Sequence, residues 1–593
     1  MDFATLWELR VEEFEDAAAG FRVLGAMADT GQAAVATEAV GALRRGVCGH
    51  AGDAAEAELG ALAENFRYAQ VECHLAAVAL AGLAADLGVL RRRLGAVVEE
   101  AEDQGMRVRQ DGSVAYPSVR VGEREAAGGV VRARSDATAI GVSQQAASVD
   151  PNPGHGRALE VARRVAALVA QASEVDERWA RRLRALEADD ELCVSAADWA
   201  DTRRDTGVVR AGAKRYLDSM PAMPTQAGPG AVAAWWRGLS AVERADVVAM
   251  YPAEVGALDG VPAAVRDEAN RVVLAQCRGG VEEELARMAA REPLPIEGTG
   301  LTAHVSPQRL RFEERRRVLR ERLGALRRFE ERLADADADA SDRRPYLLRV
   351  DPEGDGRAVV ALGDPDLARH TAVHVPGTGT DLGVMPGQLD RVERLHKAAS
   401  SNAKHGESVS TIAWLGYDAP ELSASVLTQG RAQEAAPELQ RFTEGLRETH
   451  QGERGHLTVL GHSYGSTAVG AAASKGPGLG ADDIVVVGSP GMTVEKAEEL
   501  QMDPDHVWAG ASKNDPVVSG AADLTLGRNP AKENFGAQPI DVKDGGHSSY
   551  WDEGSVSLEN QGMVIGGRKP KLREYYRDRS VGTGADGTGF HIE

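Results

Sequence analysis

The chain has 593 residues, 27% of them charged and only 5% aromatic, and its 90 acidic and 68 basic side chains give a net charge of -22 with histidines neutral. At about 150 residues per domain this length allows about four domains, and the charged fraction is ordinary for a folded protein. The acidic balance would repel phosphate backbones and anionic membrane surfaces, so the composition argues against a nucleic-acid partner.

The cysteines and histidines form no metal-binding or disulfide pattern. The four cysteines (Cys48, Cys73, Cys193 and Cys277) are scattered without a CxxC pair, and none of the 14 histidines belongs to an H-E-x-x-H motif. We therefore expect neither a metal nor a cofactor.

The amino terminus has none of the features of an ordinary signal peptide. Residues 1–8 include no basic region, and no uncharged apolar run approaches the roughly 18 residues that a membrane span needs. We expect no transmembrane segment and either a cytoplasmic location or export by another route.

Residues 1–117 are predicted to form a helical hairpin or small bundle. No proline precedes Pro117, and 26 of the first 110 residues are alanine, so strong helix formers dominate. A turn is expected near Gly31 or in the glycine-containing stretch 46–52.

Residues 118–230 are predicted to be linker and helices. The stretch 118–156 mixes Gly, Ser, Asp and Arg without periodicity, and 205–230 is a second loose stretch with three prolines. Between them we expect a helix from about 157 to 186.

Residues 231–343 are predicted to be a helical segment that leads into the next domain. Its main feature is a long amphipathic helix over 306–333, with Ser306 as N-cap and Pro307 at the first helical position. Inside it, apolar residues recur every seven positions: Phe312, Leu319, Leu326 and Leu333. This spacing predicts a coiled-coil-like seam that packs on the same chain or on a partner.

Residues 344–565 alternate short β-branched runs with helical stretches, which predicts an α/β domain with a mostly parallel sheet and helices on both faces. The candidate strands are 346–350, 358–361, 371–375, 410–414, 457–460, 483–487, 506–509 and 539–542. A flexible tail is expected over 566–593.

The clearest chemical motif is G-x-S-x-G at Gly461 to Gly465, with an apolar run before it and small helical residues after it. This context is typical of a nucleophile elbow, a tight strand-to-helix turn that exposes a serine. We expect Ser463 to be the nucleophile, and the alternative is an ordinary Gly-Ser turn.

A serine nucleophile needs a base that is oriented by a carboxylate, and in α/β-hydrolases the acid and then the histidine follow the serine in the chain. Asp515 and His547 each lie in a loop after a candidate strand, in that order. Chain order disfavours His506, while His462 is held in the elbow itself.

The oxyanion of acyl transfer needs two backbone donors. We expect the N–H of Tyr464 and one N–H from Gly377 or Thr378, in the glycine-rich loop after the strand 371–375. That loop lacks the lysine and the spacing of a phosphate-binding loop.

The chain resembles the actinobacterial α/β-hydrolase domain family, long catalogued as a domain of unknown function. The matching segments span 235–551: they are 235–240, 256–271, 375–378, 414–420, 461–465, 488–491, 514–516 and 546–547. The resemblance implies an α/β-hydrolase fold with a triad of Ser463, Asp515 and His547, and it implies no particular substrate.

The amino-terminal region is similar to the WXG-type helical hairpins of type VII secretion substrates. The glycine and alanine spacing of 50–57 fits, with His50 where the signature tryptophan would be, and Tyr68 to Glu72 has the Y-x-x-x-E form of the export signal. This resemblance implies export by the type VII route and a helical protein partner.

Together these features predict a serine hydrolase that cleaves a carboxylic ester of a small molecule or lipid. Amide hydrolysis, thioester hydrolysis and acyl transfer use the same residues. The alternative is a helical scaffold or secretion-associated binding protein with a vestigial hydrolase domain.

Overall fold

A computed structural model describes residues 1–133, 145, 150–186, 193–293, 296–297, 304–305, 307–339, 343–421, 424–518 and 525–573. The chain forms two compact units. Unit 1 contains 1–224, 235–255 and 272–323, and unit 2 contains 225–234, 256–271 and the chain from 324 onward.

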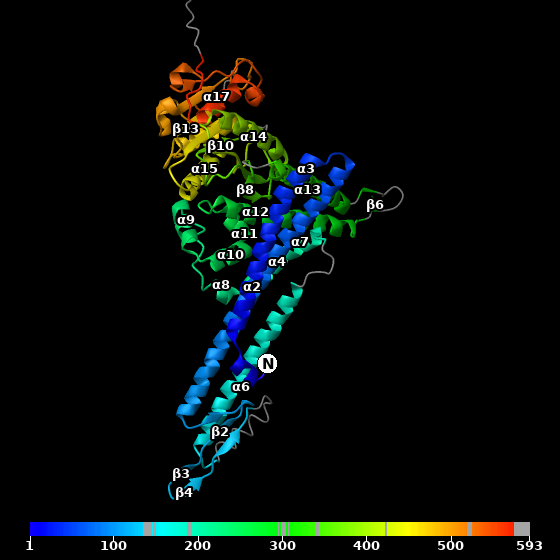
Figure 1. Ribbon diagram of the computed structural model, residues 1–593, viewed down its shortest axis with the longest axis vertical. Helices are drawn as coiled ribbons and strands as arrows, with labels where there is room; N and C mark the ends of the chain where they lie inside the picture. The colour runs from blue at the N-terminus through cyan, green and yellow to red at the C-terminus, as the bar shows by residue number, and fades with distance from the viewer. Residues whose placement is uncertain are drawn as a thin grey trace, which may run out of the picture. The chain divides into compact units, whose positions relative to one another are not determined.

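Unit 1 is built around a long helical hairpin. Helix α2 (Val11–Ala33) continues through a π-helical segment (Ala34–Ala39) and α3 (Val40–Gly46), and α4 (His50–Asp103) returns along it (Figure 1). The reversal falls within the predicted stretch 46–52 and not at Gly31, because the chain stays helical through that glycine.

Apart from α6 and α7, the other described elements of unit 1 have ten residues or fewer. They are α1 (Phe3–Glu8), β1 (Arg107–Val108), β2 (Val114–Tyr116), β3 (Val119–Val121), β4 (Arg124–Ala126), β5 (Gly129–Val131), α6 (Gly154–Ala185), α7 (Ala196–Gly212), α8 (Lys214–Leu217), α10 (Ala241–Met250), β6 (Ile296–Glu297) and β7 (His304–Val305). Four described helices have residues in both units, because a unit boundary falls inside each of them: α9 (Pro229–Gly238), α11 (Pro252–Ala257), α12 (Ala263–Ala289) and α13 (Pro307–Asp339).

Two sequence expectations for unit 1 were wrong. Residues 118–156 are not only linker, because β3, β4 and β5 pair there in antiparallel ladders. Strands of three residues are too short to show an alternating pattern in the sequence. The loose stretch 205–230 is helical over 205–212 and 214–217, because α7 continues into it and α8 follows.

The core of unit 1 lies where α4 meets α6 and α7. The buried Trp179 and Trp199 both pack there. Gly82 is required at the first contact, since a Cβ at this position would lie only 2.7 Å from the Trp179 ring. Helix packing this close needs a residue without a side chain.

Helix α4 is long and apolar enough to cross a bilayer by length and composition, the one such helix among the described residues. In its most apolar window 61% is buried inside the fold. That burial is typical of a core helix in a soluble protein, so the helix is weak evidence for a membrane span.

The Y-x-x-x-E residues lie in the middle of α4 and pack within unit 1. Tyr68 packs edge-on against Trp199, with ring centroids 5.8 Å apart. Burial, followed by the charges of Asp205, Asp201 and Asp198 on α7, raises the pKa of Glu72 to about 8.

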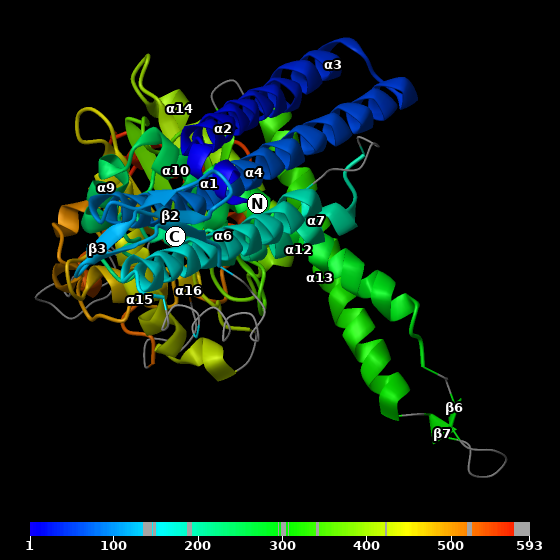
Figure 2. The same ribbon diagram turned by 90° about the horizontal axis from the view of Figure 1, so that it is seen from below.

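The predicted long helix is α13. Leu319, Leu326 and Leu333 of its seven-residue repeat are buried. Arg315 forms an ion pair with Glu284 of α12, beside which α13 runs in Figure 2, so at this point the helix packs on its own chain. Ser306, the predicted N-cap, lies outside the described residues.

Unit 2 contains an eight-stranded sheet in the order β15-β14-β13-β12-β10-β11-β9-β8. The strands are β8 (Pro345–Asp351), β9 (Arg357–Leu362), β10 (His370–Val375), β11 (Val409–Leu415), β12 (His456–His462), β13 (Asp483–Val487), β14 (Val507–Gly510) and β15 (Gln538–Pro539). The run from β15 to β11 is parallel, and β9 and β8 add antiparallel at one edge. The predicted α/β class is confirmed.

Helices cover both faces of this sheet. On one face α15 (Gly430–Thr449) and α16 (Tyr464–Ala473) share a core with Val459 and Val486. On the other face α14 (Met385–Asn402) and α17 (Val556–Ile565) share a core with Leu460 and Val485. Neighbouring residues of one strand thus enter opposite cores, as the pleat requires.

The last predicted strand and the predicted tail both differ from the structure. Of the predicted strand 539–542 only Pro539 belongs to β15, and Ile540 then forms an antiparallel bridge with Leu572. The bridge is extended by hydrogen bonds from the main-chain N–H groups of Asp541 and Arg573. Residues 571–573 of the predicted tail are therefore held against the end of the sheet, and 574–593 lie outside the described residues.

Candidate active site

Ser463 lies in a tight turn between β12 and α16. Its backbone has φ +52° and ψ -130°, a left-handed conformation that costs energy for a residue with a side chain. The flanking glycines allow the turn: a Cβ at Gly465 would lie 2.1 Å from the carbonyl oxygen of Val375, and one at Gly461 would lie 2.6 Å from Cα of Ser466. This is the geometry of a nucleophile elbow.

Two hydrogen bonds to the backbone of Ser463 hold the elbow in place. The N–H of Ser463 donates to the carbonyl of Val487 in the neighbouring strand, at 3.2 Å. The Ser466 hydroxyl donates to the carbonyl of Ser463 at 2.6 Å. Both bonds restrain the backbone of Ser463 in its strained conformation.

Asp515 and His547 form a hydrogen-bonded pair. Nδ1 of His547 lies 2.9 Å from both carboxylate oxygens of Asp515, which is fully buried. Burial alone would raise the pKa of Asp515, but hydrogen bonds from His547, Tyr550 and the main chain of Val517 outweigh it and lower the pKa. The carboxylate is therefore held ionised, and it fixes a proton on Nδ1 of His547.

The turn after β13 packs against this pair. Gly488 has φ +59°, and a Cβ there would lie 2.9 Å from Oδ2 of Asp515 and 3.2 Å from Cε1 of His547. The loops that follow β13, β14 and β15 thus meet at the Asp515–His547 pair. In sequence, the only sign of this contact is that the segment 488–491 follows a predicted strand.

The glycine-rich loop after β10 reaches the elbow. A Cβ at Gly377 would lie 2.8 Å from Cβ of Ser463 and 3.1 Å from the main-chain nitrogen of Tyr464. The Thr380 hydroxyl donates to the carbonyl of Gly377 and holds the loop. The loop that carries the predicted donor, Gly377 or Thr378, therefore lies beside Ser463 and the main-chain nitrogen of Tyr464, the other predicted donor.

Two residues that were not predicted to contribute lie against the pair. Tyr550 donates to Oδ2 of Asp515 at 2.7 Å. The His462 ring lies 4.6 Å from the His547 ring, centroid to centroid. Tyr550 follows His547 by only three residues, whereas His462 occupies the variable position of G-x-S-x-G, where sequence alone marks no function.

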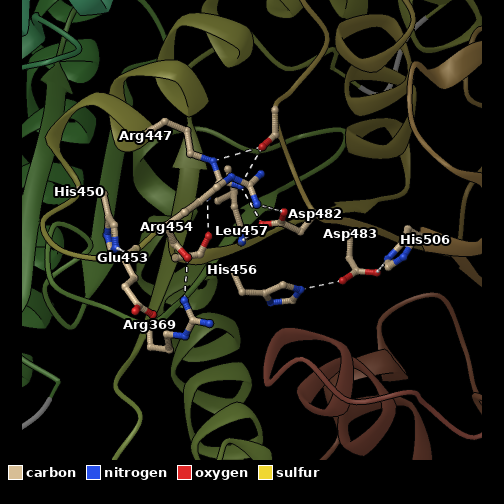
Figure 3. A network of polar contacts seen from close by, with 12 residues as sticks. Arg369, Arg447, His450, Glu453, Arg454, His456, Leu457, Asp482, Asp483 and His506 are labelled. Carbon is tan, nitrogen blue, oxygen red and sulfur yellow. Dashed lines mark hydrogen bonds and ion pairs between the residues drawn. The ribbon is translucent and has the colours of Figure 1, made fainter.

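The competing histidine His506 lies at the other end of the strands. Figure 3 shows it paired with Asp483, which also contacts His456, at 2.9 Å and 2.8 Å. His456 and Asp483 are the first residues of β12 and β13, whereas Ser463 follows the last residue of β12. This network is therefore separate from the elbow.

Among the described residues, no group of three or more His, Cys, Asp or Glu side chains is arranged to hold a metal ion. The chemistry available at the elbow is that of a hydroxyl, an imidazole, a carboxylate and backbone N–H groups.

A serine elbow after a central parallel strand, with a paired aspartate and histidine carried by loops after later strands, is the arrangement of an α/β-hydrolase domain. Residues 351–525 match the family model described as alpha/beta hydrolase. The chain belongs to this family, because it also covers most of a relative that is 31% identical to it.

That relative is Uncharacterized protein Mb0988c of Mycobacterium bovis, which aligns over 205 residues, 33% of this chain and 73% of the relative. Uncharacterized protein Rv2079 of Mycobacterium tuberculosis is 30% identical over 396 residues, 59% of this chain. The chain covers 57% of the length of that second relative. Neither name states an activity, so the family supports hydrolase activity and leaves the substrate open.

Proposed function

We propose that the chain is a serine hydrolase that cleaves carboxylic esters through a covalent acyl-enzyme intermediate. The observation that carries the proposal is the strained Ser463 elbow in a domain whose later strands bring Asp515 and His547 into a hydrogen-bonded pair. A strained residue persists only where the surrounding structure holds it, and such residues cluster at active sites.

The proposed reaction begins with attack of the Ser463 hydroxyl on the ester carbonyl. Because Nδ1 of His547 donates to Asp515, Nε2 is the ring nitrogen free to take the serine proton. The N–H groups of Tyr464 and Gly377 receive the oxyanion.

The alcohol then leaves with the proton returned by His547, and the acyl group stays on Ser463. Water, deprotonated by His547, attacks the acyl-enzyme and releases the acid through the same oxyanion site. Asp515 stabilises the imidazolium form of His547 in both halves of the reaction.

The substrate class that we propose is an acyl ester of a small molecule or lipid. Thioesters, amides and transfer to another alcohol would follow the same route, and a substrate series separates them. p-Nitrophenyl esters of graded chain length, compared with matching thioesters and anilides, give the preferred leaving group and acyl length.

The test of the class is covalent labelling with a fluorophosphonate probe. We expect wild type to be labelled and to hydrolyse p-nitrophenyl acetate, and Ser463→Ala to do neither. Ser474→Ala is the matched control and should behave as wild type, because Ser474 caps the opposite end of α16 from Ser463. A folded wild type that is not labelled would instead support a scaffold with a vestigial hydrolase domain.

A further inference from the structure

His462 lies between His547 and a buried tryptophan. Its ring centroid is 4.6 Å from that of His547, with an interplanar angle of 34°, and 4.7 Å from that of Trp551, which it meets edge-on. The side chain is buried. The imidazole of His547 therefore rests on a fixed aromatic surface.

The protonation of His462 follows from its hydrogen bond. Nε2 lies 3.0 Å from the main-chain carbonyl oxygen of His547. A carbonyl oxygen only accepts, so Nε2 must carry the proton. Burial, followed by the proximity of His547, Arg391 and His374, holds the pKa of His462 well below its usual range. The ring is therefore neutral and adds no charge that would oppose protonation of His547.

The bond connects two segments that the reaction must align. His462 immediately precedes Ser463, and His547 lies in a loop after the two-residue strand β15. The Asp515 carboxylate holds one end of the His547 side chain, and the bond from His462 holds its backbone. Base and nucleophile are thus joined through one residue, and small displacements of a base strongly reduce rates.

We propose that His462 is a positioning residue, whose Nε2–H bond to the His547 carbonyl holds the general base in register with the adjacent nucleophile Ser463. The proposal rests on the proposed serine-hydrolase function. It assigns a role to the residue at the first variable position of the elbow motif.

The test compares two substitutions that separate the ring from the hydrogen bond. His462→Phe keeps a ring and removes the donor, whereas His462→Gln loses the ring and keeps an amide donor at the reach of Nε2. For p-nitrophenyl acetate we expect His462→Phe to lower kcat by about 10- to 100-fold with KM changed less than about twofold. Fluorophosphonate labelling should slow by the same factor, and His462→Gln should recover most of both rates.

The matched control is His396, another buried histidine, whose Nε2 lies 3.1 Å from the carbonyl oxygen of Val409. His396→Phe removes a bond of the same kind between α14 and β11. We expect it to lower thermal stability and to leave kcat and the labelling rate unchanged.

The outcomes separate this inference from the proposed function. An unlabelled, inactive wild type overturns the proposed function. An active wild type with an equally active His462→Phe, or with His462→Phe and His462→Gln impaired to the same extent, overturns the positioning role alone. If His462→Phe does not fold, His462→Asn replaces it, because its shorter amide cannot reach the carbonyl, and the same loss is expected.

Discussion

The Tyr550 hydroxyl donates to Oδ2 of Asp515 at 2.7 Å, on the same carboxylate that contacts His547. The main-chain N–H of Ser512 donates to the Tyr550 oxygen at 3.1 Å, so the hydroxyl hydrogen is directed to the carboxylate. Asp515 thus receives a second strong donor. The orientation and the charge of Asp515 therefore depend on Tyr550, which is not a member of the predicted triad.

Tyr550→Phe removes this donor while keeping the ring. Loss of the hydrogen bond raises the pKa of Asp515, so on lowering the pH the carboxylate is neutralised earlier. We expect kcat/KM to fall about tenfold near neutral pH and the acidic limb of its pH profile to move to higher pH. Tyr346→Phe, in the edge strand β8, is the control, and an unmoved acidic limb would contradict the assignment.

Gly377→Ala places a methyl group against Ser463. The added Cβ would lie 2.8 Å from Cβ of Ser463 and 2.9 Å from the carbonyl oxygen of His462, so the loop must move away. We expect ester hydrolysis and fluorophosphonate labelling to fall about 100-fold, comparable to the loss of one oxyanion donor. Gly387→Ala has no atom within 4 Å of its Cβ and should be harmless. Full activity of Gly377→Ala would remove this loop from the site.

His456 is predicted to make stability depend on pH. Its Nδ1 lies 3.1 Å from the carbonyl of Ile565 and its Nε2 lies 2.8 Å from Asp483, so both nitrogens face acceptors. Burial opposes the charged ring, but the bond and charge of Asp483 outweigh it, and the pKa is raised. Asp482 and the His370 ring lie nearby, and the Asp483 carboxylate also pairs with His506.

Because the folded pKa lies above the unfolded value, this stabilisation is fully present below about pH 6.5 and is lost as the pH rises through the folded pKa. We expect His456→Gln to lower the free energy of unfolding by about 1–2 kcal/mol at pH 5.5 and by less at pH 9. Urea unfolding at the two pH values measures the difference. His405 is exposed, so His405→Gln serves as the control. If His456→Gln lowered the free energy of unfolding equally at both pH values, the His456 ring would be neutral and the prediction wrong.

Glu72 is predicted to destabilise the fold at high pH, because it is a buried acid whose ionised form is disfavoured by burial. Its pKa of about 8 means that the folded protein takes up a proton that the unfolded chain releases above about pH 4.5. Stability is therefore lost as the pH rises toward 8. Glu72→Gln should raise the free energy of unfolding by about 1–3 kcal/mol at pH 9 and change it little at pH 5. Urea unfolding of Glu72→Gln and of Glu58→Gln, on the exposed side of α4, tests this; equal effects of the two variants would contradict it.

Much of unit 2 is predictable because its signals are local. Alternation of β-branched runs and helical stretches reveals the α/β class, and seven of the eight strands lie within a few residues of their predicted positions. The last one fails because Ile540 leaves the parallel sheet to pair with Leu572 in the antiparallel direction. The short strands of 118–131 fail because three residues show no period.

By itself the sequence determined the elbow, since the glycines on either side of Ser463 are a local steric requirement, and it sets the chain order of Ser463, Asp515 and His547 on which the triad prediction depends. Only the tertiary structure decided which groups meet at the carboxyl ends of the strands. The contacts of Tyr550 with Asp515, of His462 with His547 and of Gly377 with Ser463 depend on how strands far apart in the chain are aligned in the sheet. The same is true of the Y-x-x-x-E residues, whose burial in unit 1 depends on the packing of α7 against α4. Backbone preferences act over a few neighbouring residues, whereas these contacts are set by the register and layering of whole elements.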